Sequence, residues 1–136
     1  MKIQLLIFED SKSKMDSFVE FLELKLSNEL GSTLSIVQRD DNSMLESDLN
    51  TTDFHVILID DDLGNGNWGN NIIDEIIELT DSTPGITNIP KIYYSAGTSV
   101  SELKEKIEHH GNIPCVTFEN LVDAVFNRIK AKYFPN

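Results

Sequence analysis

The chain has 136 residues, of which 23 are acidic and 11 are basic, and its formal net charge is −12. This length is typical of one domain, so a single domain is expected over residues 1–136, and the lack of a bilayer-length apolar run or a secretion signal predicts a cytoplasmic protein. The negative charge and the lack of a basic stripe argue against direct binding of DNA or RNA.

The first half of the chain alternates apolar, strand-like runs with segments of helical periodicity. The run at residues 3–8 carries no charge and is typical of a strand buried on both faces. Ser11 or Ser13 is suited to cap the helix that follows, and Gly31 is suited to end it. The elements expected here are, in order, a strand at 3–8, a helix ending before Gly31, a strand at 34–38 and a short helix near 44–49.

The second half continues the alternation. The strongest strand signal is FHVILI at residues 54–59, which stops at three consecutive aspartates. Ser99 and Glu102 match the S-x-x-E pattern of a helix N-terminus, and Gly111 is suited to end that helix. The elements expected here are a strand at 54–59, a helix over 72–79, a turn-rich segment at 80–88, a strand at 89–94, a helix around 103–107, a strand at 113–118 and a closing helix over 121–129.

These elements predict the fold class. Five strands that alternate with five helices indicate an α/β fold, with a doubly wound, five-stranded parallel sheet that carries helices on both faces. In such sheets, ligands bind beyond the carboxyl ends of the strands, where the strand order reverses. Functional residues are therefore expected just after the strands.

Polar side chains follow four of the five predicted strands. Strands one and three are neighbours in such a sheet, so carboxylates at their ends would converge and repel one another unless a cation joined them or some of them took up protons. Mg²⁺ prefers such oxygen ligands, and a carboxylate beside bound Mg²⁺ can act as a nucleophile toward phosphorus. The residues concerned are Glu9 and Asp10 after the first strand, Asp60, Asp61 and Asp62 after the third, Ser95 after the fourth and Thr117 near the end of the fifth.

The sequence resembles the receiver domains of response regulators, the CheY-like family of two-component signalling, over nearly its whole length. The resemblance rests on LLIFEDS around Glu9 and Asp10, VILIDDDL around Asp60, and YYSAG around Ser95. It implies a (βα)5 flavodoxin-like fold, Asp60 as the phosphoacceptor, and a hydrogen bond from the Ser95 hydroxyl to the phosphoryl group. The implied Mg²⁺ ligands are Glu9, Asp10, Asp60 and the backbone carbonyl of Asp62.

The same resemblance implies partners. The phosphoryl donor would be a histidine kinase or a phosphotransfer protein, and a downstream protein would bind around the fourth helix and the fifth strand, with a homodimer as one further form. Such a chain is a phosphoacceptor with at most self-catalysed phosphotransfer and dephosphorylation, and not a conventional enzyme.

The sequence also departs from the family. The family has a lysine after the fifth strand, and in IPCVTFENL that position falls on Thr117. Gly64 stands where proline is usual, and Asp61 fills a position that is usually apolar. Loss of a fixed cation removes a charge-assisted contact to a phosphoryl group. The alternative is therefore a pseudo-receiver, an interaction module of the same fold in which phosphorylation is lost or vestigial.

Three remaining features receive weaker interpretations. GNGNWG at residues 64–69 matches a dinucleotide-binding pattern, but aspartates separate it from the strand and the next strand ends without an acid, which disfavours a nucleotide-binding enzyme. The glycines are interpreted instead as a flexible turn beside the metal site. His109 and His110 are interpreted as solvated residues at a helix end. Trp68 is expected either to pack the loop over the core, which is preferred, or to offer an exposed contact.

Overall fold

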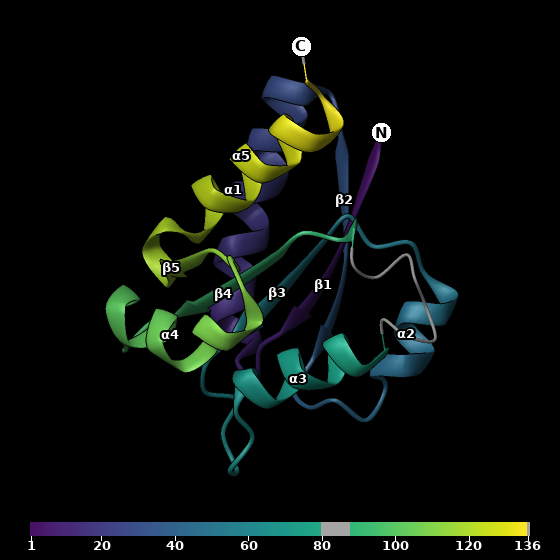
Figure 1. The fold of residues 1–136 in the computed structure, drawn as a ribbon. Helices are drawn as coiled ribbons and strands as arrows, with labels where there is room; N and C mark the ends of the chain where they lie inside the picture. The colour runs from purple at the N-terminus through teal and green to yellow at the C-terminus, as the bar shows by residue number, and fades with distance from the viewer. Residues whose placement is uncertain (80–87, 136) are drawn as a thin grey trace.

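The structure, a computed structural model, describes residues 1–79 and 88–135 and contains a five-stranded parallel sheet (Figure 1). The strand order is β2-β1-β3-β4-β5, so the order reverses between β1 and β3. This confirms the predicted doubly wound α/β sheet. Residues 80–87 of the expected turn-rich segment lie outside the described residues. The strands are β1 (Lys2–Phe8), β2 (Thr33–Arg39), β3 (Val56–Asp60), β4 (Lys91–Ser95) and β5 (Cys115–Thr117).

Helices cover both faces of the sheet. α1 and α5 lie side by side on one face, and α2, α3 and α4 pack on the other (Figure 1). Within the described part of the chain, no helix is both long and apolar enough to cross a membrane. The helices are α1 (Lys12–Leu30), α2 (Leu45–Thr51), α3 (Gly69–Leu79), α4 (Val100–Ile107) and α5 (Leu121–Tyr133), with the 3-10 turns η2 (Glu108–His110) and η3 (Phe118–Asn120).

The caps expected from the sequence are present. Ser11 Oγ accepts a hydrogen bond from the Lys14 N–H at 3.3 Å, and Gly31 ends α1 with a φ angle of 60°. Ser99 Oγ accepts the Glu102 N–H at 3.3 Å. These bonds satisfy amide groups that a helix N-terminus leaves without intrahelical partners. The first cap also places Lys14 in the first turn of α1, at the carboxyl edge of the sheet.

β4 and β5 begin later than expected, at Lys91 and Cys115. The residue before each is a proline, Pro90 or Pro114, which has no N–H to donate to a strand ladder. Their carbonyl groups still accept hydrogen bonds from the neighbouring strands. β5 also ends early, at Thr117, because the chain then enters the η3 turn.

Alternate residues of β3 point to opposite faces of the sheet. Leu58 packs in the core cluster formed with α1 and α5, whereas Ile57 and Ile59 pack in the cluster formed with α2, α3 and α4. Continuing this alternation places Asp60 on the α1 side and Asp61 on the α3 side. Two consecutive aspartates therefore enter different environments.

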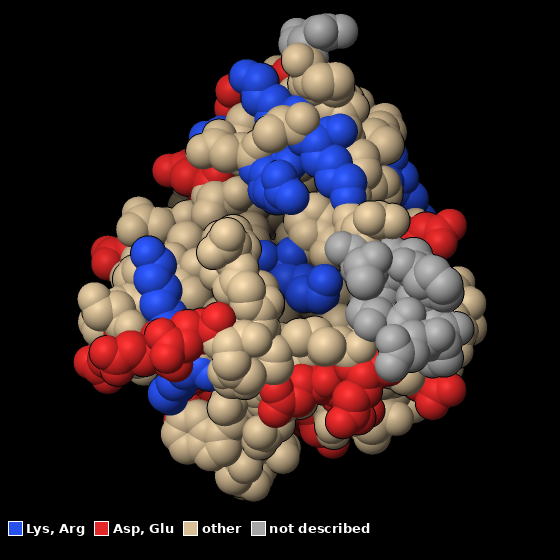
Figure 2. All heavy atoms as spheres, viewed as in Figure 1, with Lys and Arg blue, Asp and Glu red and all other residues tan. Residues whose placement is uncertain are grey.

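Charged side chains are unevenly distributed over the face shown in Figure 2. Lys and Arg gather over α5, while Asp and Glu gather over α3. This face therefore has a basic region at one end, although the chain as a whole is strongly acidic. The basic residues in the second half of α5 are Arg128, Lys130 and Lys132, and the acidic residues of α3 are Asp74, Glu75 and Glu78.

Candidate functional site at the carboxyl edge of the sheet

The carboxyl ends of β1 and β3 bring three carboxylates together. Glu9 and Asp10 follow β1, Asp60 ends β3, and the two strands are paired neighbours. One carboxylate oxygen from each of the three residues lies within 4.8 Å of the others. Glu9 and Asp60 are buried, whereas Asp10 is exposed. These three residues, with Lys14 and Ser95, are called the acidic pocket below.

Asp60 is the carboxylate most perturbed by this environment, and it is only 4% exposed. Its burial, followed by the negative charge of Glu9, raises the pKa of Asp60 to about 7. Burial and Glu9 also raise the pKa of Asp10. At neutral pH, Asp60 is therefore divided between its protonated and ionised forms, and a cation beside it would favour ionisation.

The structure supplies one such cation, Lys14, which sequence analysis did not select. Its ammonium group lies 3.0 Å from Glu9 Oε1 and 3.6 Å from Asp60 Oδ2, and Lys14 lines the pocket. The ring of Phe118 lies against it, 5.1 Å from Nζ to the ring centre. Burial lowers the pKa of Lys14, but the bond to Glu9 and the charge of Asp60 outweigh that effect and raise the pKa overall.

A sequence signal for Lys14 does exist. It stands four residues after Asp10, in the first turn of a helix that starts at the same edge of the sheet as the acids. The resemblance to receiver domains places the pocket lysine near the end of the fifth strand. The side chain reaches the pocket from α1 instead, which depends on how α1 packs across the ends of β1 and β3.

Glu9 holds Lys14 in place. Glu9 Oε2 accepts the Ser11 N–H at 3.0 Å, and Oε1 accepts the Tyr94 hydroxyl at 3.0 Å in addition to its contact with Lys14. Burial raises the pKa of Glu9, but the Ser11 amide and Lys14 together lower it more, so the pKa lies below its usual value. Glu9 is therefore the ionised partner that positions the ammonium group beside Asp60.

Ser95 ends β4, is buried, and lines the pocket. Its Oγ accepts the backbone N–H groups of Gly97 and Thr98, both at 3.1 Å. A hydroxyl that accepts two such bonds still has its own proton to donate. Ser95 can therefore donate a hydrogen bond to a group bound beside Asp60.

Two other residues predicted from the sequence to belong to the site are Asp62 and Thr117. Asp62 lines the pocket, and its side chain accepts the Gly64 N–H at 2.9 Å. Thr117 is paired in register with Ser95 on β5, and its Oγ1 accepts a hydrogen bond from Asn120 at 3.0 Å. The ammonium group that faces the phosphoacceptor candidate comes from α1 and not from the end of β5.

Asp61 points to the opposite face and is 1% exposed. The Lys106 ammonium group, from α4, donates to both of its carboxylate oxygens at 2.9 and 3.1 Å, and the Tyr93 hydroxyl donates to one of them. Lys106 Nζ also lies 4.8 Å from the ring centre of Trp68. Trp68 is 42% exposed, so of the two roles predicted for it the structure favours the exposed contact over packing on the core. Asp61 therefore ties the end of β3 to α4.

The glycine-rich connection between β3 and α3 forms a narrow hairpin that projects from the sheet edge (Figure 1). Gly64 and Gly66 have φ angles of 77° and 78°, which favour glycine. The Gly64 N–H donates to the Asp62 side chain, and the Gly69 N–H donates to the Asp61 carbonyl. Because these two amides are already bonded, the geometry does not resemble a pyrophosphate cradle.

Gly69 begins α3 directly against the end of β3. A Cβ atom at this position would lie 2.1 Å from the Asp60 carbonyl oxygen and 2.9 Å from the side chains of Ile59 and Tyr93. No side chain fits at such distances without a shift of the backbone. This close approach fixes the start of α3 beside the acidic pocket.

The chemistry of the acidic pocket suits a hard divalent cation. Its donors are carboxylate oxygens, which Mg²⁺ prefers and often binds in small numbers. Burial, followed by the negative charge of Glu9, raises the pKa of Asp60, and the charge of Lys14 offsets this only in part. The residues present therefore fit a bound Mg²⁺ ion.

No protein-family model matches the sequence, and no curated protein matches it. Solved structures match the fold. A CheY-like response regulator receiver domain protein from Methanospirillum hungatei JF-1 matches with a TM-score of 0.66 and 16% identity over 100% of both chains. The phosphorylated cyanobacterial phytochrome response regulator RcpA matches with a TM-score of 0.66 and 18% identity, covering 96% of this chain and 93% of its own.

A third match is a response regulator protein from Burkholderia pseudomallei, whose structure holds a phosphorylated aspartic acid and a calcium ion. Its TM-score is 0.66 and its identity 14%, with 98% of this chain and 72% of that chain covered. Likeness at these identities concerns the fold. The chain therefore has the five-stranded parallel α/β fold of response-regulator receiver domains, as the sequence resemblance implied.

Proposed function

We propose that this chain is a response-regulator receiver that accepts a phosphoryl group on Asp60 with the help of Mg²⁺. The observation that carries the proposal is the position of the buried Asp60 carboxylate, flanked by the Lys14 ammonium group and the Ser95 hydroxyl at the carboxyl edge of the sheet. Two of the matching solved structures are phosphorylated, one of them on an aspartic acid, and this supports the proposal.

The proposed metal ligands are the carboxylates of Asp10 and Asp60 and the backbone carbonyl of Asp62, which all belong to residues lining the pocket. Glu9 belongs to the same cluster, but its oxygens are already engaged, so it contributes mainly negative charge and the position of Lys14. Mg²⁺, when bound, neutralises the oxygens of the transferring phosphoryl group.

The transfer itself needs little from the protein beyond placement and charge. A carboxylate oxygen of Asp60 attacks the phosphorus of a phosphohistidine, a P–O bond forms, and the P–N bond breaks. The imidazole leaves with the electron pair and takes up a proton from solvent. The ionised carboxylate is the nucleophile, so Lys14, which lowers the pKa of Asp60 against the effects of burial and Glu9, favours the reaction.

Lys14 also compensates for the missing lysine of the fifth strand. Its ammonium group lies 3.6 Å from Asp60 Oδ2 and is held there by Glu9. A phosphoryl group on Asp60 would receive a charge-assisted contact from Lys14 and a hydrogen bond from Ser95. In this proposal, Thr117 has no direct role in charge neutralisation.

The proposed partners follow from this chemistry. A histidine kinase or phosphotransfer protein supplies the phosphoryl group in the cytoplasm, and a protein that binds around α4 and β5 receives the signal, with a homodimer as one form of that contact. The bond from Lys106 to Asp61 supports this choice of surface, because it links α4 to the residue next to Asp60.

One observation favours a second function, an interaction module without phosphorylation. Lys14 contacts both Glu9 and Asp60, so it partly neutralises the pocket without any metal. In that case the acidic pocket would stabilise the fold, and the same α4 surface would bind its partner constitutively.

The test is incubation of the protein with acetyl phosphate and Mg²⁺, followed by measurement of the intact mass. The wild type should gain one phosphoryl group, and Asp60→Asn should gain none. Asp61→Asn is the matched control, because this neighbouring aspartate faces the other side of the sheet and should leave the adduct intact. Circular dichroism checks that both variants fold.

The same experiment separates the two functions. An adduct that persists in Asp60→Asn would overturn the proposed phosphoacceptor. Binding of Mg²⁺ by calorimetry without an adduct, from either acetyl phosphate or a phosphohistidine donor, would support the interaction module instead.

A further inference from the structure

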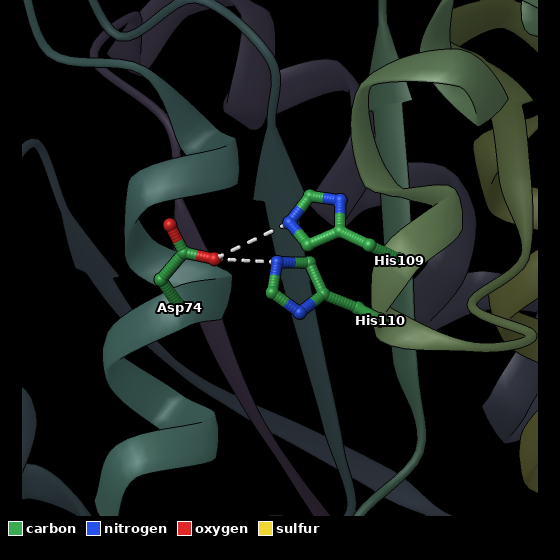
Figure 3. Close-up of side chains that lie close together, drawn as sticks. All are labelled: Asp74, His109 and His110. Carbon is green, nitrogen blue, oxygen red and sulfur yellow. Dashed lines mark ion pairs between the residues drawn. The ribbon is translucent and has the colours of Figure 1, made fainter.

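A second group of ionisable side chains lies away from the acidic pocket, between α3 and the end of α4. It consists of Asp74 in α3 and of His109 and His110 in η2. Both imidazole rings project toward α3, and dashed lines in Figure 3 join a nitrogen of each ring to the same carboxylate oxygen of Asp74. His109 Nε2 lies 3.8 Å and His110 Nε2 lies 2.5 Å from Asp74 Oδ1.

His110 is not the solvated residue that the sequence suggested. Its side chain is only 9% exposed. Its Nε2 atom is buried and has no hydrogen-bond partner among residues 1–79 and 88–135, because the close contact with Asp74 does not have hydrogen-bond geometry. A buried polar atom without a hydrogen bond is costly, and such an atom aimed at another ligand atom calls for an explanation.

The three side chains converge in a way that favours a cation. The two imidazole rings are 3.8 Å apart between centroids, and all three ligand atoms lie within 4.8 Å of one another. When both facing nitrogens are unprotonated, their lone pairs and the carboxylate oxygen repel one another at this separation unless a cation lies among them. A tetrahedral ion with bonds of about 2.0–2.1 Å holds its ligands about 3.3 Å apart, so small side-chain adjustments would suffice.

We propose that Asp74, His109 and His110 form a binding site for a divalent first-row transition metal ion of the Zn²⁺ type. Imidazole nitrogen with carboxylate oxygen suits such ions, whereas Mg²⁺ prefers oxygen ligands alone. Three protein ligands leave one position of a tetrahedral ion for water or an external ligand. The site is thus distinct in chemistry and location from the acidic pocket, and it does not depend on phosphorylation of Asp60.

The proposed ion would connect α3 to the end of α4, and both helices pack on the same face of the sheet. Ile72, Ile73 and Ile76 of α3 share one core cluster with Leu103 and Ile107 of α4. The two histidines lie in η2, which follows α4 directly, so a shared metal ion would clamp the end of α4 to α3. Binding should therefore stabilise the folded protein, and Zn²⁺ should raise its melting temperature.

The test uses the full chain with Mg²⁺ in excess, so that the acidic pocket is saturated during titration with Zn²⁺. Calorimetry should give one Zn²⁺ per chain, and Co²⁺ should give the visible absorption of a four-coordinate ion. His110→Ala and Asp74→Asn should each weaken Zn²⁺ binding at least about tenfold. Glu78→Gln is the matched control on α3, because Glu78 is exposed, and it should leave the affinity unchanged.

Three outcomes would overturn the proposal. Zn²⁺ binding that survives in His110→Ala, or that disappears in Asp10→Asn, would place the ion elsewhere. No saturable binding at all would leave a simple ion pair of a protonated histidine with Asp74. If a variant does not fold, the imidazole NMR signals of the wild type decide, because Zn²⁺ must shift those of both His109 and His110.

Discussion

Asp60 and Asp61 are consecutive residues with opposite electrostatic environments. Asp61 receives two hydrogen bonds from Lys106, at 2.9 and 3.1 Å, and one from the Tyr93 hydroxyl. Among the described residues, the cation that contacts Asp60 is Lys14, at 3.6 Å, and Asp60 shares its surroundings with the negative charge of Glu9. One carboxylate is fully paired, and the other is left short of positive charge.

This difference in pairing indicates a structural role for Asp61 and a chemical role for Asp60. A buried carboxylate with strong, complete pairing has little left to offer a ligand, so Asp61 is best understood as a link between β3 and α4. A buried carboxylate that lacks positive charge can gain free energy from Mg²⁺ or from a reaction that changes its charge. Alternation along β3 produces this contrast, because adjacent side chains point to opposite faces.

Gly69→Ala should disturb the surroundings of both aspartates and should have the largest effect on stability. The added Cβ would meet the Asp60 carbonyl oxygen at 2.1 Å, and the Gly69 N–H that donates to the Asp61 carbonyl would have to shift with it. We expect the free energy of unfolding in urea to fall by roughly 3 kcal/mol or more. Gly97→Ala is the control, because nothing lies within 4 Å of its added Cβ, and its stability should change by less than about 0.5 kcal/mol. Similar losses in both variants would contradict the steric argument.

The pH dependence of stability tests the raised pKa of Asp60. The folded-state pKa of Asp60, about 7, lies above the ordinary value of 3.8, so the protonated form is favoured by folding. The stability that this provides is present below about pH 4 and is lost as the pH rises to about 7. In EDTA, wild type should therefore lose on the order of 2 kcal/mol relative to Asp60→Asn between pH 4 and pH 8, after allowance for the open pocket.

Addition of Mg²⁺ provides a control for the predicted pH dependence. At pH 8, it should restore stability to the wild type and leave Asp60→Asn largely unaffected, because the bound ion neutralises the ionised carboxylate. Parallel pH profiles for wild type and variant would show that Asp60 is not the perturbed group.

Two lysine substitutions, one beside each aspartate, should differ in their effect on the rate of adduct formation. Lys106→Met removes the ammonium group from the buried Asp61 carboxylate and should cost roughly 2 kcal/mol in urea unfolding, less than for a fully buried pair because Lys106 is 37% exposed. It should leave the rate of adduct formation from acetyl phosphate within about twofold, because Asp61 faces away from Asp60. Lys14→Met should slow that rate roughly tenfold, because a charge-assisted contact is lost. Equal rates in the two variants would refute the assignment of Lys14 as the pocket cation.

Much of the fold was predictable because its signals are local. The apolar run at residues 3–8, the Ser99 cap and the stop at Gly31 depend on neighbouring residues, and each has its counterpart in the structure. The acids at the ends of β1 and β3 were found in the same way, since parallel neighbouring strands must bring their carboxyl ends to one edge. Local signals erred where proline delayed β4 and β5.

The partners of the charged side chains could not be read from local patterns. Lys14, Lys106 and His110 lie on or just after helices, and their roles depend on which strand end or neighbouring helix each one faces. A helix pattern gives the buried side of a helix, but not the position of its long side chains relative to a carboxylate on another element. The sequence by itself determined the sheet, the helices and the edge at which the carboxylates gather. Only tertiary packing decided that Lys14 faces Asp60, that Lys106 pairs with Asp61, and that His110 is buried against Asp74.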